Sequence, residues 1–230
     1  MTAEKRTQMN SLDIPPVDRP RQAAGEFYDR ISGFYDLLAA SSEGPFIRRG
    51  LKMLQARPGD RVLEIGSGTG RALVDLSRSV GPSGRVTGID LSEGMMDIAR
   101  ERLGGSGTEE KADLIIGDAV SLPLRDGSRD KIFSSFTLDL FSAADIDRVL
   151  EECQRVLRTE GRLVVVALSQ DQPLPPAGKA YQWLHTKFPG VIDCRPLPVR
   201  SLLERAGFQI RDHRRDLMWG IPVSITAAEK

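Results

Sequence analysis

The chain has 230 residues, 40% of them hydrophobic, which is enough to bury most of its apolar surface in one core. It carries 32 Lys and Arg residues against 32 Asp and Glu residues, a balance that creates no overall field to attract nucleic acid or an anionic membrane. The longest apolar run, 163–168, is too short to span a bilayer and no apolar signal region opens the chain, so we expect a cytoplasmic protein without integral membrane association.

The first 57 residues predict a tail followed by two helices. Residues 1–22 are polar and rich in proline, so we expect a flexible tail there and a single domain over 23–230. Apolar residues then recur at helical spacing, first from Phe27 to Leu38 and again from Phe46 to Leu54. We therefore expect residues 23–57 to form a helical cap in front of the first strand.

From residue 58 onward, short β-branched runs alternate with amphipathic stretches of helical length. We expect strands at 61–65, 85–90, 112–116, 131–136 and 162–168, helices at 71–80, 93–103 and 144–157, and a turn at 159–161. This alternation predicts a doubly wound α/β fold, in which a mostly parallel sheet has helices on both faces.

The last sixty residues predict an insert and a final hairpin. A proline-rich segment and a helical pattern bearing Tyr181, Leu184 and Phe188 indicate a substrate lid over 170–196. A helix over 199–206, ended by Gly207, precedes strands at 208–212 and 218–226 that are joined tightly. The complete sheet is then expected to have seven strands, with one antiparallel member in this C-terminal hairpin.

A glycine-rich loop follows the first expected strand. Gly66, Gly68 and Gly70 alternate with other residues between that strand and the next helix, so backbone can approach a ligand closely. Because free N–H groups at a helix start attract anions, we expect an anionic group there; the alternative is a set of tight turns without a ligand. The dinucleotide fingerprint places its third small residue one position later, at Arg71, and this spacing disfavours NAD.

Two acidic residues follow the next two strands. Asp90 ends the second strand, where a carboxylate can accept hydrogen bonds from both hydroxyl groups of a ribose. Asp118 and Ala119 follow the third strand, where a side-chain acceptor beside a backbone N–H can bind the amino group and ring nitrogen of adenine. Since parallel strands end at one edge, the three loops are expected to line one cleft that binds an adenosine group.

Four motifs in this order resemble those of class I S-adenosylmethionine-dependent methyltransferases, with the ubiquinone and menaquinone C-methyltransferases as the nearest group. They are PGDRVLEIGSGTG at 58–70, VTGIDLSEGM at 86–95, GDA at 117–119 and ECQRVLRTEGRL at 152–163. The resemblance covers about residues 26–225 and implies S-adenosyl-L-methionine as the cofactor. The chain departs from the family pattern at 159–161, where Thr-Glu-Gly replaces Pro-Gly-Gly, remote from the expected site.

By this resemblance, Glu64 and the glycine loop would hold the methionine part of the cofactor, Asp90 the ribose, and Asp118 the adenine. Tyr28 and Tyr35 would belong to the cap over the cofactor, although both also fit core packing of an amphipathic helix. The implied cofactor residues are Tyr28, Tyr35, Glu64, Gly66, Ser67, Gly68, Thr69, Gly70, Asp90, Leu91, Met95, Asp118, Ala119, Ser135 and Phe136.

Methyl transfer from a sulfonium dissipates charge, so we expect alignment of donor and acceptor to dominate catalysis, which can supply about 7–11 kcal/mol. A base matters only if the acceptor is a phenol, a carbon acid or a protonated amine, and the candidates are Asp139, His185 and Tyr28. Asp139 has the alternative of capping the helix near Ser142, and His185 that of packing in the expected lid.

The acceptor is expected to be a small or lipidic molecule. The segment after the fourth strand lacks the Asn/Asp-Pro-Pro-aromatic motif of nucleobase methyltransferases, which with the neutral charge argues against nucleic acid. A quinone precursor methylated at a ring carbon is the first hypothesis, and a phospholipid amine or a natural-product N or O atom is the second. The rival classes are an NAD-dependent oxidoreductase and a cofactor-binding protein without turnover. Cys153 and Cys194 have no Cys or His at metal-ligand spacing, so we expect no metal site.

Overall fold

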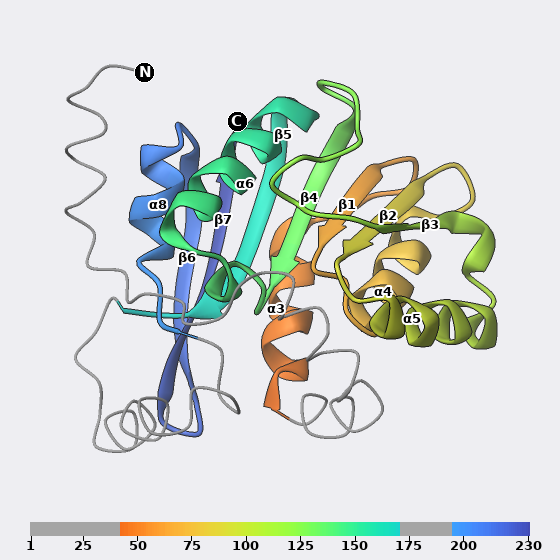
Figure 1. Ribbon diagram of the computed structural model, residues 1–230, viewed down its shortest axis with the longest axis horizontal. Coiled ribbons are helices and arrows are strands. Elements are labelled where there is room, and N and C mark those ends of the chain that lie inside the picture. The colour runs from red at the N-terminus through yellow and green to blue at the C-terminus, as the bar shows by residue number, and fades with distance from the viewer. Residues whose placement is uncertain (1–41, 171–194) are drawn as a thin grey trace.

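A computed structural model of the protein describes residues 42–170 and 195–230. These residues contain one seven-stranded sheet in the order β3-β2-β1-β4-β5-β7-β6 (Figure 1). The strands are β1 (Arg61–Ile65), β2 (Arg85–Asp90), β3 (Ala112–Ile116), β4 (Arg129–Ser135), β5 (Leu157–Leu168), β6 (Gln209–Met218) and β7 (Ile221–Glu229). Only β7 runs antiparallel to its neighbours, β5 and β6. The order reverses between β1 and β4, the position at which open α/β sheets bind ligands.

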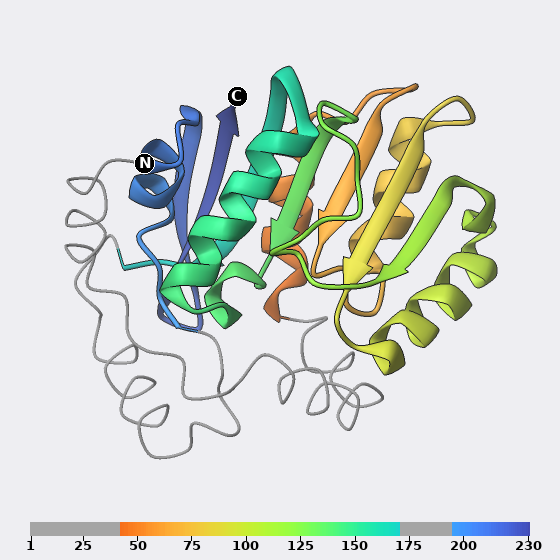
Figure 2. The same cartoon turned by 45° about the horizontal axis from the view of Figure 1, so that its top comes forward.

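Helices cover both faces of the sheet (Figure 2). One face packs against α3 (Gly44–Leu54), α4 (Arg71–Val80) and α5 (Glu93–Ser106), and the other against α6 (Ala143–Val156) and α8 (Val199–Arg205). Two short 3₁₀ helices, η1 (Glu109–Lys111) and η2 (Leu138–Leu140), complete the described elements.

Alternate residues of the buried strands belong to the two cores. In β5, Leu163 and Val165 pack beneath α6 and α8, whereas Val164 and Val166 pack beneath α3 and α4. Strands buried on both faces read as continuous apolar runs, which is why 163–168 contains no polar residue. The fold class expected from the sequence, a doubly wound sheet with one antiparallel member, is confirmed.

The element boundaries differ most from the expectation in the last three strands of the chain, β5, β6 and β7. The turn expected at 159–161 lies within the bounds of β5, because Leu157 already pairs with Arg129 and the chain bends only at Glu160, whose φ is 61°. The strand expected at 208–212 continues as β6 to Met218. The charged residues in the second half of β6 do not fit the apolar pattern by which strands are predicted. Charged residues are common, however, on an edge strand that faces solvent. The final strand is displaced to Ile221–Glu229, since Trp219 and Gly220 form the hairpin turn.

The expected tail at 1–22, most of the cap at 23–57 and nearly all of the lid at 170–196 lie outside the described residues. Within the described part, α3 is the second of the two helices expected before β1. Cys153 is a buried core residue of α6, and burial raises the pKa of its thiol to about 12.

Candidate functional site

The glycine loop between β1 and α4 is held in place by its own amide groups. The N–H groups of Gly66 and Ser67 donate to the carbonyl of Ile89, at 2.9 and 3.2 Å, and that of Gly70 donates to Ser67 O at 2.9 Å. Gly66 has a φ of 68°, and a Cβ there would lie 2.2 Å from Thr137, so only glycine fits. A Cβ on Gly68 would meet no atom within 4 Å, so the loop is open at that point.

Asp90 connects the glycine loop to the start of α5. Its carboxylate accepts from Gly68 N at 2.8 Å and from Ser92 N at 3.0 Å, while Ser92 Oγ caps α5 by accepting from Met95 N at 3.1 Å. A carboxylate with two oxygens has about four lone-pair sites, so it can accept from several donors at once. With Gly68 also engaged, the loop amides at 66, 67, 68 and 70 all have partners inside the protein. The anionic group expected at this loop is therefore not supported by these four amides.

Glu64 adds a second carboxyl group to the same region. Its side chain is only 2% exposed, and Oε2 makes no hydrogen bond to any described residue. Burial, followed by the nearby charges of Asp90 and Asp75, raises the pKa of Glu64 well above its usual value. An uncompensated carboxyl beside a second carboxylate favours a ligand that brings a hydrogen-bond donor or a positive charge. It opposes the dianionic pyrophosphate of a dinucleotide.

Further polar contacts hold Thr69 and the loop after β3. Arg102 of α5 donates through Nη1 to the carbonyl oxygen of Thr69 and also, at 2.7 Å, to Thr69 Oγ1. The segment after β3, residues 117–128, is named here the β3–β4 loop. Its first residue, Gly117, donates to Asp90 O at 2.9 Å, and Asp118 Oδ1 accepts from Val120 N at 3.1 Å. The loops after β1, β2 and β3 are thus joined at one edge of the sheet.

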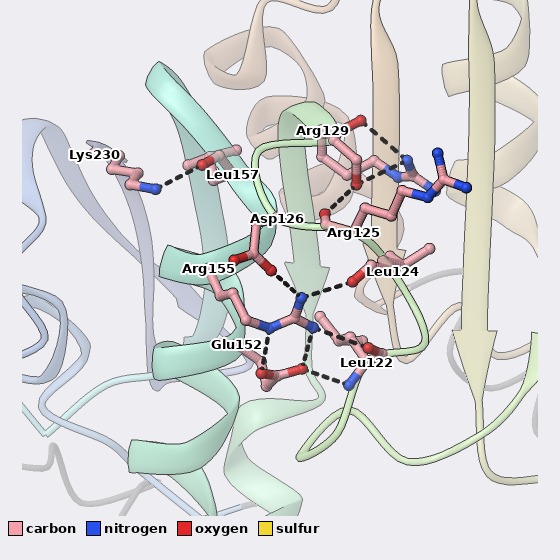
Figure 3. A network of polar contacts seen from close by, with 10 residues as sticks. Leu122, Leu124, Arg125, Asp126, Arg129, Glu152, Arg155, Leu157 and Lys230 are labelled. Carbon is pink, nitrogen blue, oxygen red and sulfur yellow. Dashed lines mark hydrogen bonds and ion pairs between the residues drawn. The ribbon is translucent and has the colours of Figure 1, made fainter.

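Figure 3 shows the contacts between Arg155 and Glu152 of α6 and the β3–β4 loop. Arg155 donates to the carbonyls of Leu122 and Leu124 at 2.9 and 2.7 Å and pairs with Asp126 and Glu152, each at 2.7 Å. Glu152 in turn accepts from Leu122 N at 2.6 Å. The Arg155 guanidinium lowers the pKa of Glu152, and Glu152, followed by Asp126, raises the pKa of Arg155. This network stabilises the shape of the loop that carries Asp118 and Ala119.

The end of β4 approaches the glycine loop directly. Phe136, a buried residue, has a φ of 50°, an unusual value for an aromatic residue. Its N–H donates to Val166 O at 2.8 Å, and the next residue, Thr137, donates through Oγ1 to Ser135 O at 2.9 Å. Strained backbone of this kind is often found at ligand sites. Ser135 and Phe136 lie at the end of β4, as expected from the sequence, and close to the loop that contains Gly66.

Asp139 lies in η2 and is completely buried. Arg195, itself only 2% exposed, donates through Nε to Asp139 O at 3.3 Å and through Nη2 to Phe141 O. Burial lowers the pKa of Arg195, and the charge of Asp139 partly opposes this effect. The alternative in which Asp139 caps α6 is wrong, because Ser142 is the N-cap and accepts from Asp145 N at 3.2 Å. Tyr28, Tyr35 and His185 lie outside the described residues.

Comparisons with known proteins agree with this geometry. Residues 62–161 match the family model described as a methyltransferase domain. A demethylmenaquinone methyltransferase from Staphylococcus aureus (strain JH9) is 33% identical over 179 residues, which is 78% of this chain and 70% of that one. One from Lactobacillus johnsonii is 31% identical over 155 residues, 66% of this chain and 63% of that one. The chain belongs to the class I S-adenosylmethionine-dependent methyltransferases.

A solved structure supports the fold of this methyltransferase. A SAM dependent methyltransferase from Aquifex aeolicus aligns with a TM-score of 0.59 at 22% identity, covering 92% of this chain and all of that one. The cofactor of the family, S-adenosylmethionine, carries a sulfonium, an ammonium and a carboxylate. The described residues fit such a molecule, since the buried Glu64 Oε2 is without a protein partner and the loop is open at Gly68.

Several residues that support the methyltransferase site were not recognised from the sequence. Ile116 ends β3 opposite Asp90 and is 53% exposed, and the expected cofactor residue Leu91 is 38% exposed beside it. Exposed apolar residues at these positions indicate a ligand site only when it is known that they lie at the carboxyl ends of β3 and β2. Arg102 and Arg195 act through backbone carbonyls, which no sequence pattern reveals.

Two searches of the described residues complete the description of the site. In the ranges 42–170 and 195–230, no group of three or more His, Cys, Asp or Glu side chains has the arrangement of a metal site. In the same part of the chain, no helix combines the length and the apolar character needed to cross a membrane.

Proposed function

We propose that this methyltransferase transfers the methyl group of S-adenosylmethionine to a ring carbon of a small lipidic quinone precursor. The observation that carries the acceptor class is the 33% identity, over 179 residues, to a demethylmenaquinone methyltransferase. The neutral overall charge agrees with an uncharged acceptor.

For the cofactor, we assign Asp90 to the ribose hydroxyl groups and Glu64 to the ammonium group. Asp90 is held at the end of β2 by Gly68 N and Ser92 N, and its carboxylate is a strong acceptor for the hydroxyl groups of a ribose. Glu64 would exchange an unpaired buried oxygen for a charge-assisted hydrogen bond. Asp118 and Ala119, on the loop fixed by Arg155, would read the adenine edge, and Leu91 and Ile116 would provide apolar walls for its ring.

When bound, S-adenosylmethionine supplies an electrophilic methyl group on a positively charged sulfur. The protein's contribution is alignment: the glycine loop and Asp90 fix the donor, and the strained Phe136 at the end of β4 forms the boundary between donor and acceptor. For a ring-carbon acceptor, the residues of this chain would hold the acceptor carbon in line with that methyl group and would take up the proton that the ring carbon releases.

For proton removal, we assign Asp139 a positioning role rather than that of the base. Its side chain is fully buried, and the Arg195 guanidinium stabilises its charge. A base has to reach the proton that it removes, directly or through one water molecule. Tyr28 and His185 remain the candidates for this role by the family resemblance.

The test is methyl transfer with methyl-labelled S-adenosylmethionine and purified protein, offered a demethylmenaquinone in detergent and, separately, phosphatidylethanolamine. We expect label in the quinone, none in the phospholipid, and at least a tenfold lower rate for Asp90→Ala at subsaturating cofactor, about the value of one lost charge-assisted hydrogen bond. Label in the phospholipid alone, or none above a heat-killed control, would refute the acceptor class.

A further inference from the structure

The hairpin that joins β6 to β7 presents large apolar side chains to solvent. Leu217 is 55% exposed and Trp219 is 72% exposed, the two highest values among the large apolar residues in the described ranges. Together with Arg214 and Arg215 they form what is named here the hairpin tip. A soluble domain rarely keeps a tryptophan and a leucine exposed side by side unless they meet a partner.

The turn itself does not require a tryptophan. Trp219 and Gly220 are its two central residues, with φ values of 53° and 81°. Turns of this kind favour Asn-Gly or Asp-Gly, because a bulky side chain at positive φ is strained. The aromatic residue thus occupies a position where it is both conformationally unfavourable and exposed, which indicates a role outside the fold.

The hairpin tip lies at the same edge of the sheet as the cofactor site. β6 runs parallel to β5, so Met218 and Trp219 lie toward the carboxyl ends of the parallel strands. β7 pairs with β5 only as far as Val223, opposite Leu168, and the turn projects beyond that point (Figures 1 and 2). A surface that docked at the tip would therefore face the strand ends that carry the candidate cofactor site.

Basic side chains surround the tip. Arg215 is exposed and makes no ion pair in the part of the chain that the structure describes, whereas Arg214 is exposed and pairs with Asp212 at 3.0 Å. Arg49 of α3 pairs with Asp216, which places α3 against the hairpin, and α3 presents Arg48, Arg49 and Lys52 to solvent without any Asp or Glu. Although the chain is neutral as a whole, its charge around the tip is positive, with Asp212 and Asp216 as the acidic residues on this stretch of β6.

We propose that the hairpin tip docks on an anionic lipid bilayer, with Trp219 and Leu217 entering the interface and the arginines contacting headgroups. Tryptophan is enriched at membrane interfaces, because its ring is amphipathic. Stable peripheral binding needs apolar insertion together with attraction to anionic lipid, and both are present at the tip. The proposal goes beyond the proposed function, although a lipidic acceptor would give such docking its use.

The test is flotation of the full chain with vesicles, without cofactor or acceptor, so that its result is independent of any methylation assay. Vesicles of phosphatidylcholine alone are compared with vesicles that contain equal parts of phosphatidylglycerol. We expect binding to the anionic vesicles that weakens with salt, and about a tenfold loss in the double variant Leu217→Ser, Trp219→Ser. The Arg214→Gln, Arg215→Gln variant is expected to lose several-fold in affinity.

Ile116→Ser is the matched control, since it removes a comparably exposed apolar side chain from β3, the outermost strand on the opposite side of the sheet from β6, and should bind vesicles like wild type. Because no cofactor is present in the flotation test, the place of Ile116 in the proposed adenine site does not affect this comparison. In a Trp183→Phe background, Trp219 emission should shift to the blue on binding and be quenched by brominated lipid. Absence of wild-type binding to anionic vesicles, or equal binding by the folded double serine variant, would overturn the proposal. If the double serine variant lost methyl transfer to the acceptor in detergent but bound vesicles like wild type, the hairpin tip would be a binding site for the acceptor. That result would also overturn the proposal.

Discussion

Replacing Glu64 with glutamine is expected to stabilise the ligand-free protein and to weaken cofactor binding. The carboxyl is buried and its pKa is raised well above the usual value, mainly by burial and then by Asp90. A carboxyl with a raised folded-state pKa favours folding below its unfolded pKa, and this contribution is lost as the pH rises through the folded-state pKa. Glutamine keeps the shape and stays neutral, so the variant lacks that loss.

Above the folded-state pKa of Glu64, we expect Glu64→Gln to be more stable than wild type by about 1–3 kcal/mol, the usual cost of a buried polar group without a partner. For a chain of this length, that is a rise in Tm of about 2–4 °C per kcal/mol. Affinity for S-adenosylhomocysteine should fall by about 1–3 kcal/mol, because the ammonium group loses a charged acceptor. The loss for S-adenosylmethionine should be larger, since its sulfonium adds a second positive charge.

The stability change is measured by urea unfolding at several pH values between about 5 and 9, a range that begins near the reference pKa of a carboxyl and extends above it. The affinity for S-adenosylhomocysteine is measured by calorimetric titration. Ser224→Ala is the matched control. Ser224 Oγ is also buried without a partner among the described residues, but it lies in β7, three strands from β1. The control should leave affinity unchanged. A Glu64→Gln variant that is less stable than wild type at high pH, or that binds S-adenosylhomocysteine equally well, would refute the reasoning.

Three further predictions concern the same edge of the sheet. Asp90→Ala should weaken S-adenosylhomocysteine binding by about 1–3 kcal/mol, whereas Asp113→Asn, which breaks an exposed pair with Arg85, should leave it unchanged in the same titration. Gly68→Ala should fold, at a cost of about 1–2 kcal/mol for its φ of 49°, yet bind less cofactor, while Gly66→Ala should fail to give a native circular dichroism spectrum because its Cβ would lie 2.2 Å from Thr137. Arg195→Leu should lower the free energy of unfolding by about 1–3 kcal/mol, since the carbonyls of Asp139 and Phe141 lose a buried donor, and no loss in urea unfolding would show that these contacts do not stabilise the fold.

The parallel part of the fold could be predicted because its signals are local. β1, β2 and β3 have the expected bounds, since each is a short apolar run between turn residues. The start of α5 follows from Ser92, a residue type that caps helices and does so here. Asp90 and Asp118 were found because parallel strands bring their carboxyl ends to one edge, whatever lies between them in the sequence.

What could not be predicted depends on contacts between distant residues. Arg195 is 56 residues from Asp139, and nothing in either segment indicates that their backbones meet. The anionic group expected at the glycine loop was a reasonable consequence of free helix amides. It stays a prediction, but the amides of Gly66, Ser67 and Gly68 would not take part, because they donate to Ile89 O and the Asp90 carboxylate, contacts that appear only when β1 and β2 pair. The length of β6 was missed because edge strands tolerate charge.

The crystal structure of the complex with S-adenosylhomocysteine tests the central claim most directly. The account predicts that both ribose hydroxyl groups donate to the Asp90 carboxylate, that the ammonium group donates to Glu64, and that the sulfur lies above the end of β4 beside Phe136. A ligand bound away from the ends of β1, β2 and β3, or one that leaves Asp90 without a contact, would contradict it.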